Sequence, residues 1–130
     1  MFVLDASAVV ELILHTPVGV ALRRRLFTPW NVLYAPEFLD LEVTDVLRRR
    51  AAYGDLSPER ARVAFEDLLN FPLERFPHAS LMRRVWELRG NISAYDAAYV
   101  ALAEGLGAPL LTRDARLSRA PGHQARIEVV

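Results

Sequence analysis

The fold is decided near the start of the chain, by the stretch Phe2-Val3-Leu4-Asp5-Ala6-Ser7. Its three consecutive apolar residues, 2–4, lack the polar alternation of a half-exposed strand and are typical of a strand covered on both faces. A helical segment over residues 8–14 follows at once; it is opened by Asp5-Ala6-Ser7 and stops near Pro17. A buried strand that leads directly into a helix is typical of α/β proteins.

The same alternation continues along the chain. Short apolar runs predict further strands over residues 32–35, 73–76, 110–112 and 127–129. Helices are expected over residues 17–27, 38–53, 57–70, 79–89 and 94–106. The pattern predicts a single α/β domain over residues 1–130. We expect a Rossmann-like, three-layer arrangement in which helices wrap a central, mostly parallel sheet of four to five strands.

The composition excludes several functional classes. The chain has 130 residues, 52% of them hydrophobic, and no cysteine, which rules out zinc ribbons, thiol nucleophiles and disulfide scaffolds. All 16 basic residues are arginine, so mechanisms that need a lysine, such as P-loop phosphate binding, are excluded too. Sixteen acidic residues balance these arginines, so any contact with nucleic acid must be local. No membrane span or signal peptide is visible, and we expect a cytoplasmic protein.

Two acids stand at the ends of predicted strands. Asp5 directly follows the first strand, and Asp114 comes two residues after the strand over residues 110–112. In open parallel sheets the functional crevice lies beyond the carboxyl ends of the strands, so these acids meet there if the two strands are neighbours. Taken singly, each acid is better explained as a helix N-cap or a loop aspartate, because caps favour aspartate.

Glu42 is an acid in an apolar helix face. At about 100° per residue it falls between Phe38 and Val46, where a carboxylate is disfavoured unless it is paired, protonated or bound to a cation. The alternative is a buried ion pair, with Arg49 as the partner on the same side of the helix.

Asp96 lies in the first turn of an alanine-rich helix that carries only one other charge, Glu104. Close packing of so many alanines predicts a buried helix. The alternative explanation is a capping box, because Ser93 and Asp96 have the required spacing, although the box usually takes Glu or Gln. Tyr95 and Tyr99, on the same helix, are interpreted as packing groups.

Convergence of the four acids would demand a cation. Two ionised carboxylates about 5 Å apart repel by roughly 3 kcal/mol at an effective dielectric constant of about 20. Oxygen donors without cysteine or a nearby histidine favour Mg²⁺ or Mn²⁺. Zinc is not expected, since His15, His78 and His123 show no zinc-binding spacing and are interpreted as surface residues.

Four segments together resemble one family, the PIN-domain ribonuclease toxins of the VapBC toxin–antitoxin type. The similarity covers nearly the whole chain, and the ordered set is specific where single motifs are weak. The segments are Val3-Leu4-Asp5-Ala6-Ser7, residues 35–48 with Pro36-Glu37-Phe38 and Leu41-Glu42, residues 91–104 with Ser93-Ala94-Tyr95-Asp96, and residues 110–117 with Leu111-Thr112-Arg113-Asp114. The resemblance implies a PIN-like fold, in agreement with the α/β pattern.

The resemblance also implies a function, a metal-dependent endoribonuclease that cleaves single-stranded RNA with a metal-activated water. By this likeness the catalytic and metal-binding quartet is Asp5, Glu42, Asp96 and Asp114, with one or two Mg²⁺ or Mn²⁺ ions. Weaker candidates at polar positions beside the quartet are Ser7, Asn91 and Thr112. Arginines that recur every three residues beyond the strand over residues 110–112 are the RNA-binding candidates: Arg113, Arg116 and Arg119.

The partners implied are a cognate VapB-like antitoxin and the RNA substrate, with a homodimer that joins the antitoxin in a hetero-oligomer; no membrane partner is expected. One alternative is a catalytically silent PIN module that binds the antitoxin or RNA. Another is a Mg²⁺-dependent phosphotransfer enzyme, which the missing lysine disfavours. The arginine triplets at residues 23–25 and 48–50 are better explained as solvated charges at helix ends than as RNA contacts.

Overall fold

Strand β1 (Phe2–Leu4) lies at the centre of a five-stranded sheet with the order β3-β2-β1-β4-β5. The computed structural model describes residues 1–130, and every strand pair in it is parallel. The remaining strands are β2 (Leu33–Pro36), β3 (Glu74–Phe76), β4 (Leu110–Thr112) and β5 (Ile127–Val129). The predicted mostly parallel sheet of four to five strands is therefore confirmed.

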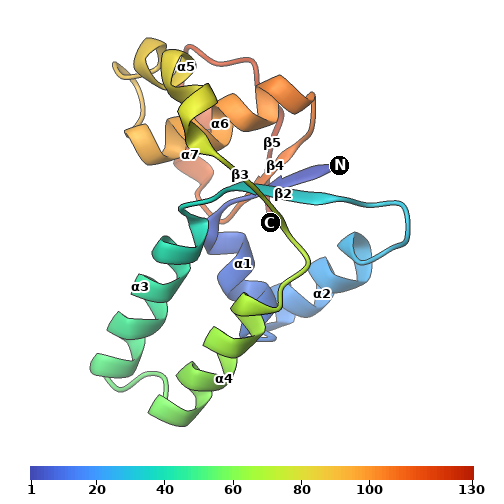
Figure 1. Cartoon of the computed structure of the whole chain (residues 1–130), viewed down its shortest axis with the longest axis vertical. Helices are drawn as coiled ribbons and strands as arrows, with labels where there is room; N and C mark the ends of the chain where they lie inside the picture. The colour runs from blue at the N-terminus through green and yellow to red at the C-terminus, as the bar shows by residue number, and fades with distance from the viewer.

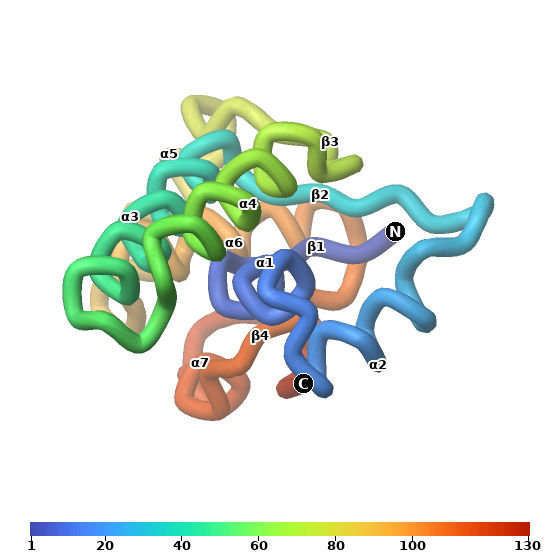
Figure 2. Tube along the Cα trace, turned by 90° about the horizontal axis from the view of Figure 1, so that it is seen from below, coloured from blue at the N-terminus to red at the C-terminus, as the bar shows by residue number.

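Helices connect the strands and cover both faces of the sheet. They are α1 (Ala6–Ile13), α2 (Pro17–Leu26), α3 (Leu39–Ala52), α4 (Pro58–Leu69), the 3₁₀ turn η1 (His78–Leu81), α5 (Met82–Glu87), α6 (Ala94–Leu106) and α7 (Ala115–Arg119). Figure 1 shows α1 to α4 on one side of the sheet and α5 and α6 on the other. In Figure 2, which looks from the opposite side of the sheet to α6, α1 lies in front of β1 and β4.

Local capping explains where several helices begin. The side chains of Asp5, Thr16, Ser57 and Ser93 each accept a backbone N–H in the first turn of α1, α2, α4 and α6. Such caps satisfy amide groups that the helix leaves without partners. Gly107 ends α6 with a φ of 62°, a left-handed conformation that glycine adopts without a steric penalty.

The core fills the space between the sheet and its helices. It is one continuous cluster that includes the fully buried strand residues Val3, Leu4, Leu110 and Leu111. These four residues have neighbours above and below the sheet, as the unbroken apolar pattern of the two strands predicts. Their burial fixes the carboxyl ends of β1 and β4 at one rigid edge.

One expectation about helices was wrong, and one short helix was not expected. The single helix expected over residues 79–89 is instead η1 followed by the short α5. Pro77 is extended and immediately precedes η1, so the segment starts as a tight turn before it widens into α5. Helix α7 was not expected, because five residues are too few to leave a periodic pattern.

No single helix is long and apolar enough to cross a membrane. Helices α1 and α2 reach the required length and composition only as a pair, and the pair is bent by 100°.

Candidate active site

The two strand-end acids lie at one edge of the sheet because β1 and β4 are neighbours. Val3 pairs with Leu110 and Leu4 with Leu111, so Asp5 and the segment after β4 emerge side by side. Parallel strands bring their carboxyl ends together, which confirms the condition on which the sequence prediction depended.

Asp5 is held by hydrogen bonds from three directions. The Ser7 hydroxyl donates to Oδ1 at 2.6 Å, the Ala8 N–H donates to the same oxygen at 3.1 Å, and the Thr112 hydroxyl donates to Oδ2. Only 8% of the surface of Asp5 is exposed. Burial raises the pKa of its carboxyl, and the hydrogen bonds oppose the rise. Asp5 is the N-cap of α1 as well, so the capping explanation is correct for this acid but incomplete.

Ser7 and Thr112 join the two strand ends. The Ser7 hydroxyl accepts the Arg113 N–H at 2.8 Å, and the Thr112 hydroxyl accepts the Asp114 N–H at 2.9 Å. Both hydroxyls also donate to Asp5. The two residues thereby fix the backbone after β4 against the carboxylate at the end of β1.

Glu42 reaches the same region from α3 and is held by a tyrosine. The Tyr99 hydroxyl, from α6, donates to Glu42 Oε1 at 2.6 Å. Arg49, the expected ion-pair partner, instead contacts Asp45 at 3.1 Å, so the buried ion pair was wrong. Burial raises the pKa of Glu42 first, and the negative charges of Asp96 and Asp5 raise it further against the Tyr99 hydrogen bond.

Asp96 stands in the first turn of α6. Its N–H donates to Ser93 Oγ at 3.2 Å, so the predicted cap at Ser93 is present. Burial is the main cause that raises the pKa of the Asp96 carboxyl, followed by the charge of Asp5, and the charge of Asp114 adds to the rise. Asp5, Glu42 and Asp96 thus lie within electrostatic range of one another, although they come from different elements.

Asp114 is the one acid of the quartet with a cationic partner. It caps α7 by accepting the Arg116 N–H at 2.9 Å. The Arg116 guanidinium donates from Nε to Oδ1 and from Nη2 to Oδ2, both at 3.2 Å, and holds the pKa of Asp114 below its usual value. A cavity of about 310 Å³ opens beside this pair. Its polar lining consists of Asn91, Ser93, Asp96, Asp114 and Arg116.

The donor set suits a hard divalent cation. All four acids offer only oxygen, and the mutual repulsion that raises the pKa of Glu42 and Asp96 is the kind that a doubly charged ion relieves. With the side chains in their present positions, no three acids stand close enough together to ligate a single ion. The acids of the quartet are therefore coupled through the effects of their charges on one another's pKa values, and they do not form a closed coordination shell.

Only one of the three RNA-binding candidates lines this cavity. Arg116 does so, whereas Arg113 contacts Glu11 at 3.4 Å and donates to the Val130 carbonyl. Arg119 is exposed on α7. The triplet at residues 48–50 forms ion pairs with Asp45 and Asp55 on its own surface, which agrees with its interpretation as solvated charge.

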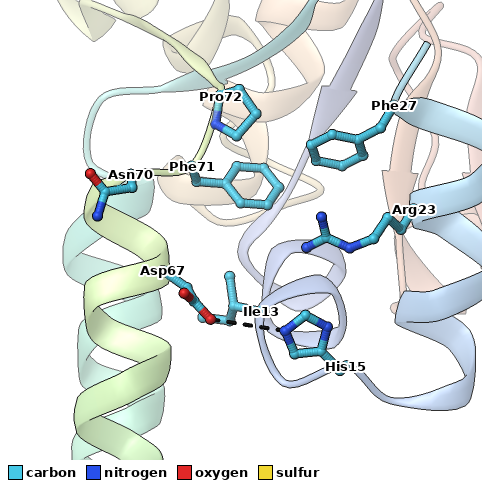
Figure 3. Close-up of a pocket in the computed structure, with 8 residues that line it drawn as sticks. All are labelled: Ile13, His15, Arg23, Phe27, Asp67, Asn70, Phe71 and Pro72. Carbon is cyan, nitrogen blue, oxygen red and sulfur yellow. Dashed lines mark ion pairs between the residues drawn. The ribbon is translucent and has the colours of Figure 1, made fainter.

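A second cavity, of about 300 Å³, lies away from the acidic quartet (Figure 3). It opens between the end of α1, α2 and α4, and its lining includes Phe27, Phe71 and Arg23. His15 and Asp67 face each other across it at 3.9 Å. Asp67 is its single carboxylate, so this cavity lacks the acids that metal-dependent hydrolysis requires.

Sequence reasoning missed the role of Tyr99. Interpreted as a packing group, it does fill the core with only 2% of its surface exposed, but its hydroxyl also fixes Glu42. The available signal was its position three residues after Asp96, because residues at this spacing share a helix face. That face is the one that points toward the other acids.

Comparisons with known proteins agree with this architecture. The PIN domain family model matches residues 2–123. Ribonuclease VapC12 of Mycobacterium tuberculosis is 43% identical over 130 residues, which cover 100% of this chain and 99% of the relative. Ribonuclease VapC1 of the same organism is 40% identical over 129 residues, 98% of this chain and 96% of the relative.

Among solved structures, VapBC2 from Rickettsia felis, bound to a DNA fragment from its promoter, contains a chain with the same fold. The TM-score is 0.71 at 18% identity, and the match covers 98% of this chain and 97% of that chain. Since the family model and the curated relatives both extend over nearly all residues, the chain belongs to the PIN-domain family.

Proposed function

We propose that this chain is a metal-dependent endoribonuclease and the toxin of a toxin–antitoxin pair. This proposal rests on Asp5, Glu42 and Asp96, three acids from separate elements at the carboxyl edge of the sheet. The negative charge of Asp5 raises the pKa values of both Glu42 and Asp96. Full-length similarity to proteins named ribonucleases supplies the reaction class. The solved VapBC2 assembly supports an antitoxin partner of the VapB type.

Asp5 and Asp96 are the principal metal ligands in this proposal, with Glu42 and Asp114 completing the site directly or through water. A bound Mg²⁺ or Mn²⁺ would polarise the scissile phosphate and lower the pKa of a water ligand. The protein keeps its ligands in place: Ser7 and Thr112 fix Asp5, and Tyr99 occupies one oxygen of Glu42. Glu42 Oε2 then remains to orient the attacking water.

The substrate class that fits is single-stranded RNA. The cavity beside the acids is open and carries an arginine, Arg116, whose guanidinium matches two phosphate oxygens at once. Water attack in line with the leaving oxygen needs no covalent enzyme intermediate, so the chain requires no activated serine or cysteine. Residues Asn91 and Ser93 line the same cavity and are available to contact the RNA sugar or phosphate.

Cleavage of end-labelled single-stranded RNA tests the proposal. The wild-type chain should cleave with Mg²⁺ or Mn²⁺ and stop with EDTA, while Asp5→Asn and Asp96→Asn should remove cleavage and leave the chain folded. Asp45→Asn is the matched control, because it deletes one acid of α3 that pairs only with surface arginines. Cleavage that survives EDTA or both site variants would contradict the proposal. A metal-binding wild type without cleavage would instead indicate a silent PIN module.

A further inference from the structure

Arg116 is the one cation that acts on the acidic quartet. It contacts Asp114 through two side-chain nitrogens. Its positive charge also opposes the rise in the pKa of Asp96. Asp5 and Glu42 have no cation among the groups that shift their pKa values; hydrogen bonds alone oppose their burial. Among the groups that shift the pKa values of these acids, Arg116 on α7 is therefore the one that brings positive charge.

The ion pair between Arg116 and Asp114 can be broken at little cost in free energy. The Arg116 side chain is 87% exposed, so water screens the ion pair and its contribution to folding is small. Asp114 has a second reason to stay in place, since its Oδ1 accepts the Arg116 N–H as the cap of α7. The guanidinium can leave while the backbone bond still holds the carboxylate.

We propose that Arg116 is an exchangeable internal counterion: it balances Asp114 in the metal-free chain, yields that carboxylate to the divalent cation, and then pairs with a phosphate of the RNA. This inference deepens the proposed function and rests on it. A fork of N–H groups that binds two carboxylate oxygens also fits two phosphate oxygens. Arg116 lines the same cavity as Asp96 and Asp114, so the released guanidinium stays where the substrate would enter.

Exchange predicts effects of opposite sign on two measurements. Without Arg116 the cation meets no competitor at Asp114, so it should bind more tightly. The RNA loses a phosphate contact, so cleavage should fall. A residue that only supports the structure of α7 would weaken both.

The test uses Arg116→Gln, with Arg62→Gln as the matched control. Arg62 lies on α4 and pairs only with Glu59, at 3.5 Å, so its replacement removes the same formal charge away from Asp114. Titration calorimetry measures Mn²⁺ binding to the RNA-free chain, and steady-state cleavage with saturating Mn²⁺ gives kcat/KM. We expect Arg116→Gln to bind Mn²⁺ about fivefold more tightly and to lose about tenfold in kcat/KM. Arg62→Gln should remain near wild type in both.

The outcomes separate this inference from the proposed function. Equal or weaker Mn²⁺ binding by Arg116→Gln, next to normal wild-type cleavage, overturns the counterion role alone. Tighter binding with unchanged kcat/KM overturns the phosphate contact. Tighter binding by Arg116→Gln in a chain that never cleaves RNA supports the counterion and contradicts the ribonuclease. Arg116→Lys should restore wild-type Mn²⁺ affinity but only part of kcat/KM, because lysine keeps the charge and loses the fork.

Discussion

At the scale of single residues, the candidate site is set by what surrounds each carboxylate. Two carboxylates of equal chemistry, Asp5 and Asp114, have pKa values shifted in opposite directions, because one is buried and the other faces an arginine. The sequence could place these acids at strand ends, since that depends only on the order of elements. It could not show the Tyr99 and Arg116 contacts, because they depend on the directions of side chains from other elements.

Tyr99→Phe should separate packing from positioning. The ring remains, so the chain should fold with a loss of about 1 kcal/mol for one hydrogen bond. The Tyr99 hydrogen bond lowers the pKa of Glu42, so its removal should raise that pKa. Glu42 would then stay protonated to higher pH, and the acidic limb of the pH–rate profile for RNA cleavage should shift to higher pH.

Tyr95→Phe is the matched control for this profile. Tyr95 lies four residues earlier on α6, is 60% exposed, and packs edge-on against Phe38 as Tyr99 does. Its profile should coincide with that of the wild type. An unshifted acidic limb in Tyr99→Phe would show that this hydroxyl does not control Glu42.

At the scale of elements, local signals decided which helices could be predicted. The bounds of α6 agree with the expected range 94–106, because a serine cap precedes it and a glycine ends it. Residues 79–89 carried a helical pattern but no such cap, and the structure divides them. Helix α7 depends on Asp114 and on contacts with its neighbours, which a short stretch of sequence does not record.

Ser93→Ala should affect both stability and the site. Loss of this cap should lower the free energy of unfolding by about 1 kcal/mol and loosen the first turn of α6, which carries Asp96. Ser57→Ala removes an equivalent cap from α4, a helix that carries none of the four acids. Urea unfolding should show similar losses for both variants, while RNA cleavage should fall only in Ser93→Ala. Equal cleavage in the two variants would contradict a link between this cap and Asp96.

At the scale of the whole molecule, the parallel sheet concentrates negative charge at one edge. The strand order was open from the sequence, yet the position of Asp5 and Asp114 required β1 and β4 to be adjacent, and they are. Burial raises the pKa values of Asp5, Glu42 and Asp96 above their ordinary values of 3.8, 4.5 and 3.8. The fold therefore binds protons at these three carboxyls more strongly than the unfolded chain does.

This proton linkage predicts how stability depends on pH. A raised pKa contributes stability that is complete below the unfolded value and is lost as pH rises through the folded value. In EDTA, urea unfolding over a pH series should therefore show stability that falls as pH rises from the ordinary values of these three acids through their raised folded values. Glu104 and Asp114, whose pKa values are lowered, lose their contribution only as pH falls below their ordinary values. Excess Mg²⁺ or Mn²⁺ should reduce the fall in stability with rising pH, since a bound cation stabilises the ionised acids.

Asp5→Asn provides the control for the pH experiment. Asparagine still caps a helix, so α1 should form, and one of the three costly ionisations disappears. The stability of this variant should fall less with rising pH than that of the wild type over the same pH series. If the stability of Asp5→Asn and of the wild type changed equally with pH, Asp5 would not contribute to the proton linkage.

The double use of Asp5, as the first cap of α1 and as a member of the acidic cluster, has a consequence in the cell. Replacement of one carboxylate oxygen of Asp5 by an amide nitrogen would leave the outer surface of the chain unaltered and its active site without function. Such a harmless copy would still engage an antidote protein that recognises that surface. Made in excess, it would act as a decoy and free the working copies from restraint.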